Sequence, residues 1–335
     1  MFQELAIKRV IEAHKAAILA KPNVVGVGVG YKLFNGGQTR EMSVVTLVRR
    51  KISVDGLAPE ALVPRQVEGV PTDVVEVGEL WALRSPLDRW RPAPGGVSVG
   101  HYRVSAGTLG GVVRDRASGA TLILSNNHVL ANSNDAQLGD AILQPGGANG
   151  GKIATDQIAR LERFVPISFN TENAQCGVAM NYADVGNIIA SLLGSSHRLE
   201  PIHVNPRASN RVDAAVARPI NDADLSGEIM EIGEVTGTLP GQLGMPVRKS
   251  GRTTGFTRGE IVAVETTVTV NFGGGRTATF DGQYVAGPMS QDGDSGSLVV
   301  ASDSQAAVGL LFAGSTKATI FNPMQAVLDS LEVDL

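Results

Sequence analysis

The sequence predicts a mainly β protein preceded by a small α+β domain. From about residue 98 onward, short apolar runs alternate with glycine-rich turns, a spacing typical of sandwiches and barrels rather than of βαβ units. The 40 glycines and the aromatic content of only 4% fit a chain with many turns and close backbone approaches. At 335 residues, the chain is long enough for one large core or two.

Residues 1–90 are predicted to form the α+β domain. Residues 3–20 should be an amphipathic helix, because apolar residues recur at helical spacing and Pro22 follows the run. Three strand-like runs come next, namely Val24–Lys32, Met42–Arg50 and Val67–Val77. Together these elements predict a compact unit of about 80 residues, within the usual size range of small domains.

Three alternating glycines in the first strand-like run raise the alternative of a dinucleotide site. Gly26, Gly28 and Gly30 fall inside the predicted strand, however, rather than in a loop that opens a helix. Close backbone packing explains them better. We therefore expect no nucleotide cofactor, and no other cofactor is indicated.

A stretch rich in Pro, Gly and Arg, residues 84–97, indicates the boundary to a second domain over residues 91–335. A short closing helix is predicted over Pro323–Leu331, begun by a favourable first-turn proline. The strands expected between them are Ala106–Val113, Thr121–Ser125, Val212–Ala217, Gly259–Phe272, Ser297–Ala301 and Ala306–Ala313.

Charge and cysteine content limit the partners and the compartment. The net charge is −4 and the basic residues are scattered, which argues against a nucleic-acid partner. No segment approaches the roughly 18 apolar residues of a membrane span, and the first residues do not resemble a secretion signal. The single cysteine, Cys176, excludes an intrachain disulfide and suits a reducing compartment. We expect a cytoplasmic protein that does not contact a membrane.

Three local patterns point to acyl-transfer chemistry. His128 ends a polar turn after an apolar strand, Asp213 opens an apolar strand, and Ser295 lies between glycines in Gly-Asp-Ser-Gly. A serine hydroxyl needs an imidazole to take its proton, and the imidazole needs a carboxylate to fix its tautomer. Each pattern alone is weak. Their combination, with 85 and 82 residues between successive members, leaves room for one barrel to lead into a second.

The glycine before the nucleophile has its own predicted task. Gly293 lets the backbone bend so that its N–H and that of Ser295 converge on one point. Such a pair of donors stabilises the oxyanion of a tetrahedral intermediate.

The order His, Asp, Ser with a terminal GDSG resembles the chymotrypsin-like serine proteases. The stretches KSGRTTGFTRGEI (249–261), TVTVNFGGG (267–275) and GDSGS (293–297) are similar to the second barrel of the bacterial branch that contains α-lytic protease and the streptogrisins. The resemblance covers roughly residues 98–330. It implies a double β-barrel with the active site between the barrels, and the catalytic triad His128, Asp213 and Ser295.

The resemblance also implies how the nucleophile loop is supported. Asp294 needs a cationic partner, since a buried unpaired carboxylate is costly. No IVGG-like processing site lies near residue 98, and Lys249 sits where the α-lytic-like branch carries an internal basic residue. We expect a Lys249–Asp294 pair and activity without zymogen cleavage.

Three departures from the family pattern are visible. Ser297 stands where most relatives carry a second glycine, and the disulfides of the family are missing. Phe312-Ala313-Gly314 replaces the usual Ser-Trp-Gly strand that binds substrate backbone, so a serine that commonly supports the triad aspartate is lost. None of these changes removes a triad member.

The substrate pocket should bear no fixed charge. Met289 is expected at its base, with Ser290 and Phe312 nearby, and the strand edge continues through Ala313 and Gly314. This composition favours an apolar or small residue before the scissile bond. Asp292, near the predicted pocket mouth, could favour a basic residue at a neighbouring subsite, although a solvated loop residue is the simpler interpretation.

The remaining candidates carry less weight. His197, Glu200 and His203 could be imagined as metal ligands, but HRLEPIH contains a proline and has no second cluster, so a surface turn is expected and no metal. An apparent insertion, residues 166–205, holds a helical run at Ala183–Leu193 that could cover the cleft or mediate assembly.

The sequence therefore predicts a serine endopeptidase acting on protein or peptide substrates. A catalytically silent protease fold that serves as a binding or scaffold module is the alternative from another class. An esterase would share the chemistry but would normally use an α/β-hydrolase frame. The N-terminal domain is a candidate surface for a regulatory partner or a second copy of the chain.

Overall fold

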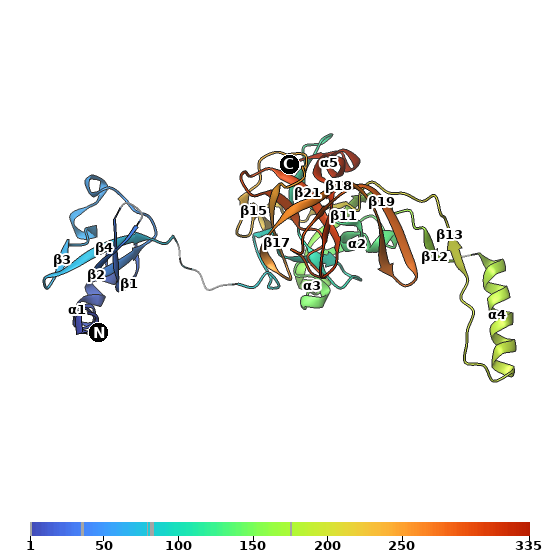
Figure 1. The fold of residues 1–335 in the computed structure, drawn as a ribbon, viewed down its shortest axis with the longest axis horizontal. Coiled ribbons are helices and arrows are strands. Elements are labelled where there is room, and N and C mark those ends of the chain that lie inside the picture. The colour runs from blue at the N-terminus through green and yellow to red at the C-terminus, as the bar shows by residue number, and fades with distance from the viewer. Residues whose placement is uncertain (1, 35–36, 79, 81–83, 175) are drawn as a thin grey trace. The chain divides into compact units, whose positions relative to one another are not determined.

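A computed structural model of the chain describes residues 2–34, 37–78, 80, 84–174 and 176–335. The chain forms two compact units, residues 1–84 and 85–335. Figure 1 identifies the elements of each unit. Residues 85–90 belong to the second unit, where the backbone N–H of Trp90 donates to the buried Gln144 at 2.8 Å.

The first unit is one helix packed against a mixed sheet. Its elements are α1 (Phe2–Leu19), β1 (Val24–Phe34), β2 (Gly37–Val48), β3 (Gln66–Val67) and β4 (Val70–Glu76). The sheet order is β1-β2-β4-β3, with β2 and β4 parallel. Ile7, Val10 and Ile18 of α1 are buried with Val44 and Val48 of the sheet.

The structure tests two predictions for this unit, one about the glycines of β1 and one about the strand Val67–Val77. Gly26, Gly28 and Gly30 lie inside β1, as predicted. A Cβ at Gly30 would come within 2.8 Å of Val45 and one at Gly26 within 3.0 Å of Leu47, so close packing explains these two glycines. At Gly28 a Cβ would meet no atom within 4 Å, so the packing explanation was wrong there. The single strand Val67–Val77 was wrong. Glu68, with φ of +49°, and Gly69, with φ of +76°, turn the chain back into the β3–β4 hairpin.

The second unit contains two eight-stranded sheets and a small three-stranded one. The first large sheet comprises β6 (Ser98–His101), β7 (Gly107–Thr108), β8 (Gly111–Asp115), β9 (Thr121–Ser125), β10 (Ala141–Leu143), β11 (Gln157–Phe164), β14 (Ala215–Pro219) and β23 (Val333–Asp334). Its order is β23-β8-β9-β14-β11-β10-β6-β7. Because β7 at one end leads within two residues into β8 near the other end, the sheet must curl back on itself.

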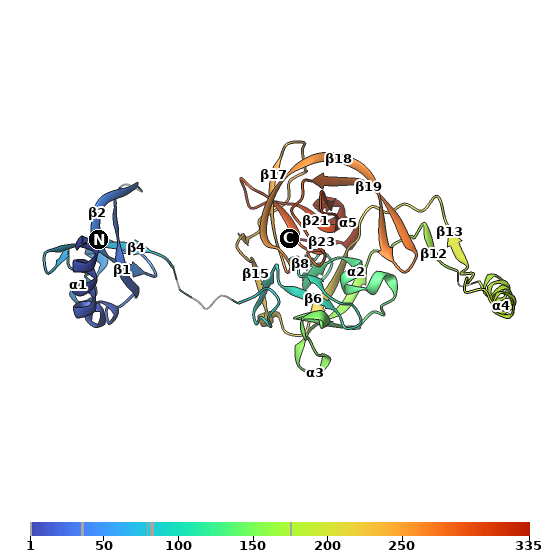
Figure 2. The ribbon, with the colours of Figure 1, turned by 60° about the horizontal axis from the view of Figure 1, so that its bottom comes forward.

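The second large sheet closes into a barrel. It comprises β12 (Thr171–Asn173), β13 (Ile202–Val204), β17 (Pro246–Gly251), β18 (Gly255–Gly273), β19 (Arg276–Ala286), β20 (Leu298–Ala301), β21 (Ala307–Gly314) and β22 (Thr319–Pro323). Strands β17 to β22 pair in a ring, since β19 also pairs with β22. Figure 2 shows β18 and β19 curving over this barrel.

The remaining elements connect or cap the sheets. They are β5 (Ala93–Gly95), β15 (Leu225–Ile229) and β16 (Gly233–Glu234) of the small sheet, and the helices α2 (Asn127–Leu130), α3 (Ile153–Asp156), α4 (Gly177–Leu192) and α5 (Met324–Leu331). Short 3-10 turns occupy Val54–Gly56, Pro59–Ala61, Asn132–Asn134, Gly147–Asn149 and Asp222–Asp224. The predicted closing helix is present, but Pro323 ends β22 and caps the helix rather than standing in its first turn.

A shared apolar core joins the two barrels. Leu122 and Leu124 from β9 meet Leu298 and Val300 from β20, and α5 adds Leu328. This core brings the strand that precedes His128 close to the strand that follows Ser295. The predicted mainly β fold, with two large curled sheets after an α+β unit, is therefore confirmed.

Candidate active site

His128 and Asp213 are brought together because the end of β9 lies beside the start of its antiparallel neighbour β14, with Ser125 opposite Ala215. Strand β9 ends at Ser125 and passes directly into α2, which holds His128, while Asp213 lies just before β14. Nδ1 of His128 is 2.6 Å from Oδ2 of Asp213, and the His128 backbone N–H donates to Oδ1 at 3.3 Å. The carboxylate is fully buried, whereas the imidazole is 23% exposed. This contact occupies Nδ1 and leaves Nε2 available on the exposed side.

Two buried asparagines hold the backbone of Asp213. Its N–H donates to Oδ1 of Asn322 at 3.1 Å, and its carbonyl accepts from Nδ2 of Asn126 at 2.7 Å. Both asparagine side chains are buried. They fix the aspartate from the barrel that carries Ser295 and from the turn that carries His128.

An aromatic ring fixes the outer edge of the imidazole. Phe272, near the end of β18, lies edge-on to His128 with ring centroids 6.0 Å apart. It also lies near Phe169 and Phe280, with ring centroids 5.7 Å and 6.1 Å away. Packing of this kind restricts the rotation of the imidazole.

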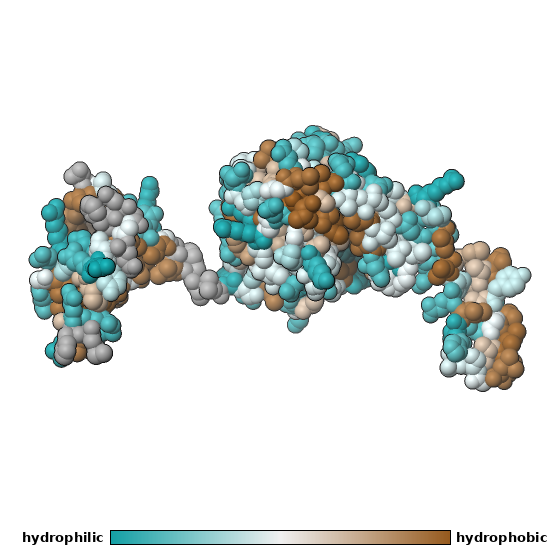
Figure 3. All heavy atoms as spheres, in the orientation of Figure 1, coloured by the Kyte–Doolittle hydropathy of each residue, from teal (hydrophilic) through white to brown (hydrophobic). Residues whose placement is uncertain are grey.

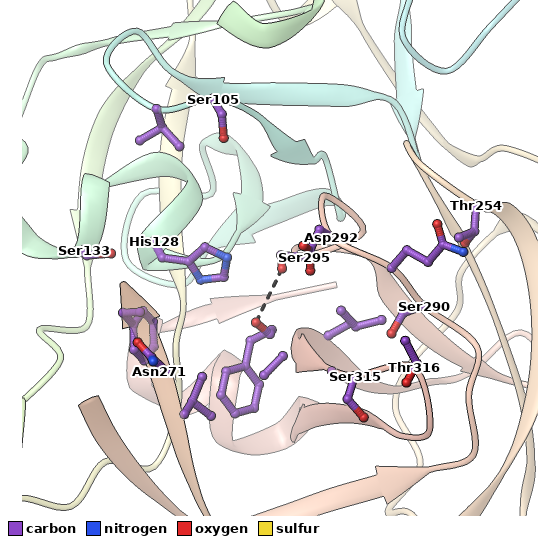
Figure 4. A pocket seen from close by; sticks show the side chains of 18 of the residues that line it. Ser105, His128, Ser133, Thr254, Asn271, Ser290, Asp292, Ser295, Ser315 and Thr316 are labelled. Carbon is purple, nitrogen blue, oxygen red and sulfur yellow. Dashed lines mark hydrogen bonds between the residues drawn. The ribbon is translucent and has the colours of Figure 1, made fainter. Parts of the chain in front are cut away.

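Ser295 faces the same cavity as His128, as Figure 4 shows. Its Oγ donates to the carbonyl of Phe312 at 3.4 Å. No hydrogen bond joins Ser295 to His128 among the residues that the structure describes. Such bonds are often long or misaligned without substrate.

Every carbonyl from Asp292 to Ser295 is engaged. That of Asp292 accepts from Oγ1 of Thr253 at 2.8 Å, and that of Asp294 accepts from Oγ of Ser297 at 2.6 Å. Thr108 of the first sheet serves the other two. Its Oγ1 donates to the Gly293 carbonyl at 2.9 Å, and its N–H donates to the Ser295 carbonyl at 2.7 Å.

These carbonyl bonds orient the N–H groups of the loop. In a trans peptide the N–H points away from the preceding carbonyl. Thr253 binds the Asp292 carbonyl, so the N–H of Gly293 in the same peptide points away from Thr253. Ser297 binds the Asp294 carbonyl, so the N–H of Ser295 points away from Ser297. Within the described chain no acceptor takes up either N–H, whereas those of Asp294 and Gly296 are bonded to Gln291 and Leu311.

The glycines on either side of Asp294–Ser295 are required by conformation. Gly293 and Gly296 both have φ of +96°, which an L-residue with a side chain rarely adopts. A Cβ at Gly296 would also overlap Oγ of Ser125 and the carbonyl of Thr108. The loop thus forms a tight turn directly against the first sheet.

Lys249 and Asp294 form a buried ion pair beneath the loop. Nζ of Lys249 is 3.2 Å from Oδ2 of Asp294, and neither side chain is exposed. Oγ1 of Thr254 donates to Oδ2 at 2.7 Å and also accepts from Lys249. Three backbone N–H groups, from Gln291, Thr253 and Thr254, complete the carboxylate's partners.

The surroundings shift the pKa of both charged groups. Burial opposes the charge on Asp294, but Lys249, the Thr254 hydroxyl and the backbone donors together hold its pKa below the ordinary value. Burial lowers the pKa of Lys249, against the attraction of Asp294. The carboxylate is thus ionised at neutral pH.

A cavity of about 1120 Å³ opens beside Ser295. All six residues predicted for the pocket line it, namely Met289, Ser290, Asp292, Phe312, Ala313 and Gly314. Met289 is almost fully buried, and Oγ of Ser290 is 2.8 Å from Oγ1 of Thr319. A Cβ at Gly314 would come within 2.9 Å of Oγ of Ser290, so the cavity is narrow there.

The residues weighed as metal ligands do not converge. His197, Glu200 and His203 are exposed, and His203 instead lies 3.5 Å from Glu172. No group of metal-ligating side chains is found in the described part of the chain. In the same part, no helix is both long and apolar enough to cross a bilayer.

Sequence reasoning missed the residues that position the site. Thr108, Thr253, Asn126, Asn322 and Phe272 act through contacts with distant parts of the chain. For Asn322, the available sign was a polar side chain directly after the apolar pair Ile320-Phe321.

Comparisons with known proteins find likeness in structure alone. No protein-family model matches the chain, and no curated protein does. Among solved structures, a Nocardiopsis protease has 18% identity and a TM-score of 0.46, protease A of Thermobifida fusca 16% and 0.44, and a Cellulomonas bogoriensis chymotrypsin 18% and 0.44. Each match covers 72% of this chain and 97% of the other.

Proposed function

We propose that this protein is a serine endopeptidase that works through an acyl-enzyme. One observation carries the proposal: His128, bonded to a buried Asp213, and Ser295 face one cavity, and the N–H groups of Gly293 and Ser295 have no acceptor among the described residues. These are the parts that acyl transfer requires.

In the proposed mechanism Ser295 rotates away from the Phe312 carbonyl and bonds to Nε2 of His128. Its Oγ attacks the substrate carbonyl carbon as His128 takes the proton, and Asp213 stabilises the imidazolium. The N–H groups of Gly293 and Ser295 bind the oxyanion. His128 then gives the proton to the leaving amine, and a water molecule hydrolyses the acyl-enzyme by the same steps.

An extended peptide fits the open edge of β21. Strand β20 pairs with β21 only as far as Leu298 opposite Leu310. Beyond Leu311, the one bond from the described chain to this side of β21 comes from the Ser295 hydroxyl, which donates to the Phe312 carbonyl. Addition of a substrate strand there would use main-chain hydrogen bonds. Protein or peptide substrates are therefore favoured over small esters.

The pocket composition favours an apolar or small residue before the scissile bond. Met289, Ser290 and Phe312 carry no charge, and Gly314 lies close to Ser290, although the charged residues Arg103 and Asp292 also line the cavity. A peptide library should therefore return uncharged residues at this position. Selection of Arg, Lys or Glu would contradict the assignment.

Activity without zymogen cleavage is supported by the Lys249–Asp294 pair. Lys249 already supplies the buried cation that a newly freed amino terminus would otherwise provide. We expect Lys249→Ala to lose most activity and about 3–5 kcal/mol of stability, as when one partner of a buried pair is removed. Activity equal to wild type would refute this role.

The competing function is a silent protease fold used as a binding module. The bond from Ser295 to Phe312, rather than to His128, favours this alternative. A fluorophosphonate probe separates the two, because it labels only an activated serine. We expect labelling of wild type, none in Ser295→Ala, and retained labelling in Ser105→Ala, a second serine in the same cavity.

A catalytic series extends this test. Asp213→Asn should lower kcat about 10⁴-fold, since the imidazole loses the partner that fixes its tautomer. A folded wild-type protein that neither labels nor cleaves any library peptide would establish the binding module instead.

The compartment and the N-terminal unit also belong to the proposal. A cytoplasmic location suits a chain whose one cysteine, the exposed Cys176, is unpaired. In that setting, we assign the N-terminal unit the role of recruiting substrate or a regulatory partner.

A further inference from the structure

The arm of the second unit presents an apolar helix to solvent. We define the arm as β12, α4, the returning segment 194–201 and β13. Strand β12 pairs with β13 and joins the barrel at Thr171 opposite Thr277. Figures 1 and 2 both show α4 beyond these strands, away from the barrels.

Five apolar residues form a continuous seam along α4. Their separations of four, three, four and three residues match the a and d positions of a heptad. The seam consists of Val178, Tyr182, Val185, Ile189 and Leu192, which are 65%, 77%, 57%, 52% and 82% exposed. Ile188 and Leu193 flank it and are equally open, and Figure 3 shows hydrophobic surface along α4. We call these seven residues the α4 seam.

Contacts on the opposite face of α4 fix the rotation of the helix about its own axis. Nδ2 of Asn187 donates to the Leu199 carbonyl at 3.0 Å, and Oδ1 accepts from the Leu199 N–H at 2.7 Å. Gly186 lies so close to Leu199 that a Cβ would come within 2.6 Å, and Ala183 is buried. The arm therefore holds the seam outward, and none of the apolar cores formed by the described residues of this unit includes it.

The seam is large enough for a stable pair of helices. Complete burial of one aliphatic side chain removes about 100 Å² from water. Seven such residues offer roughly 600–700 Å² per copy, so two copies would bury about 1,200–1,400 Å², within the range of specific interfaces.

Charge favours a second copy over a membrane as the occupant. Asp184 is the only charged residue of α4, so the helix lacks the cations by which interfacial helices bind anionic lipid. With this one charged residue, α4 also places little charge where two copies would meet. Heptad spacing suits two identical helices, and a two-fold axis lets one surface complement itself. We propose that the α4 seam pairs with the α4 seam of a second copy, making the protein a homodimer through its arms.

Sedimentation velocity on the full chain tests the pairing. We expect a species of about twice the 35.0 kDa chain mass at micromolar concentration. Ile189→Glu and Tyr182→Glu should each raise the dimer dissociation constant at least tenfold. The control Leu243→Glu, at a residue 67% exposed outside the arm, should leave it unchanged. A wild-type monomer at 100 μM, or an Ile189→Glu variant that remains dimeric, would overturn the proposal.

A cross-linking experiment covers the case in which a glutamate variant misfolds. In a Cys176→Ser background, Val185→Cys at the middle of the seam should oxidise to a covalent dimer. Ser191→Cys, exposed on another face of α4, should not. Equal cross-linking of both variants would contradict the pairing.

Seam-dependent binding of a monomer to phosphatidylcholine–phosphatidylglycerol vesicles would overturn the proposed pairing in favour of a lipid surface. Since no readout uses activity, the outcome is independent of the proposed peptidase function.

Discussion

At the scale of single residues, the nucleophile loop is organised by its carbonyls. Thr253, Thr108 and Ser297 bond all four carbonyls from Asp292 to Ser295, which leaves the N–H groups of Gly293 and Ser295 without acceptors among the described residues. Ser297 thus has a clear task. Its hydroxyl fixes the Asp294–Ser295 peptide.

Thr253→Val should lower kcat about tenfold with little change in KM. Without the hydroxyl, the Asp292–Gly293 peptide can turn, so its N–H binds the oxyanion less often. Outright loss of such a donor costs about 10²–10³ in kcat. Thr267→Val, which removes an exposed bond to Asp281, is the matched control. A tenfold fall in kcat in both variants, or in neither, would contradict the positioning role of Thr253.

Gly314→Val should narrow the substrate pocket. The new Cβ would lie 2.9 Å from Oγ of Ser290 and 3.0 Å from the Ala318 carbonyl. Peptides with a large apolar residue before the scissile bond should lose at least 100-fold in kcat/KM, whereas alanine peptides should lose less. A uniform loss for all peptides would indicate damage to the fold rather than to the pocket.

The candidate triad could be predicted because its members carry local patterns. His128, Asp213 and Ser295 each stand at a strand end beside recognisable neighbours, and the Lys249–Asp294 pair follows from the same resemblance. Asn322 and Thr253 carry no such pattern. They lie 109 and 39 residues from the groups they hold, so only the folded chain reveals their contacts.

At the scale of elements, β17 supports the nucleophile loop electrostatically. Lys249 on β17 is joined to Asp294. Burial raises the pKa of Asp294, but Lys249, the Thr254 hydroxyl and the backbone N–H groups of Gln291 and Thr254 outweigh it and hold the pKa below the ordinary value. A carboxyl with a depressed pKa stabilises the fold fully above its unfolded pKa. That stability is lost as the pH falls through the folded pKa.

Asp294→Asn should therefore cost about 3 kcal/mol in free energy of unfolding at neutral pH. The difference from wild type should stay constant from pH 8 to 5 and shrink below about pH 3.9, where the unfolded carboxyl takes up a proton. Denaturant unfolding at each pH measures it. Asp135→Asn breaks an exposed pair with Arg276 and should cost under about 1 kcal/mol. A pH-independent difference for Asp294→Asn down to pH 2 would contradict the assignment.

Element boundaries were predicted less well than element types. The run Ala106–Val113 is divided between β7 and β8, and α4 begins at Gly177, six residues before the predicted helical run. Alanine, glycine and asparagine in its first turns mask the helical period. Strand β18 extends from Gly255 to Gly273, beyond the predicted Gly259–Phe272, because pairing with β17 and β19 extends it at both ends.

At the scale of the whole molecule, the candidate chemistry belongs to the second unit alone. A variant lacking residues 1–84 retains both barrels and every residue of the cavity. We expect its turnover of a short fluorogenic peptide to stay within twofold of the full chain, with a changed set of protein cleavage sites. Equal cleavage of both peptide and protein substrates would count against a recruiting role for the first unit.

The hydrogen bonds that hold the loop from Asp292 to Ser295 also restrict how the protein could be inhibited. Collapse of the loop would break several hydrogen bonds across two barrels and disturb a buried ion pair. An inhibitor should therefore bind at the cavity entrance and leave the conformation of the loop unchanged. Deuterium exchange at the amides of Asp294 and Gly296 should be equally slow in the free and the inhibited protein.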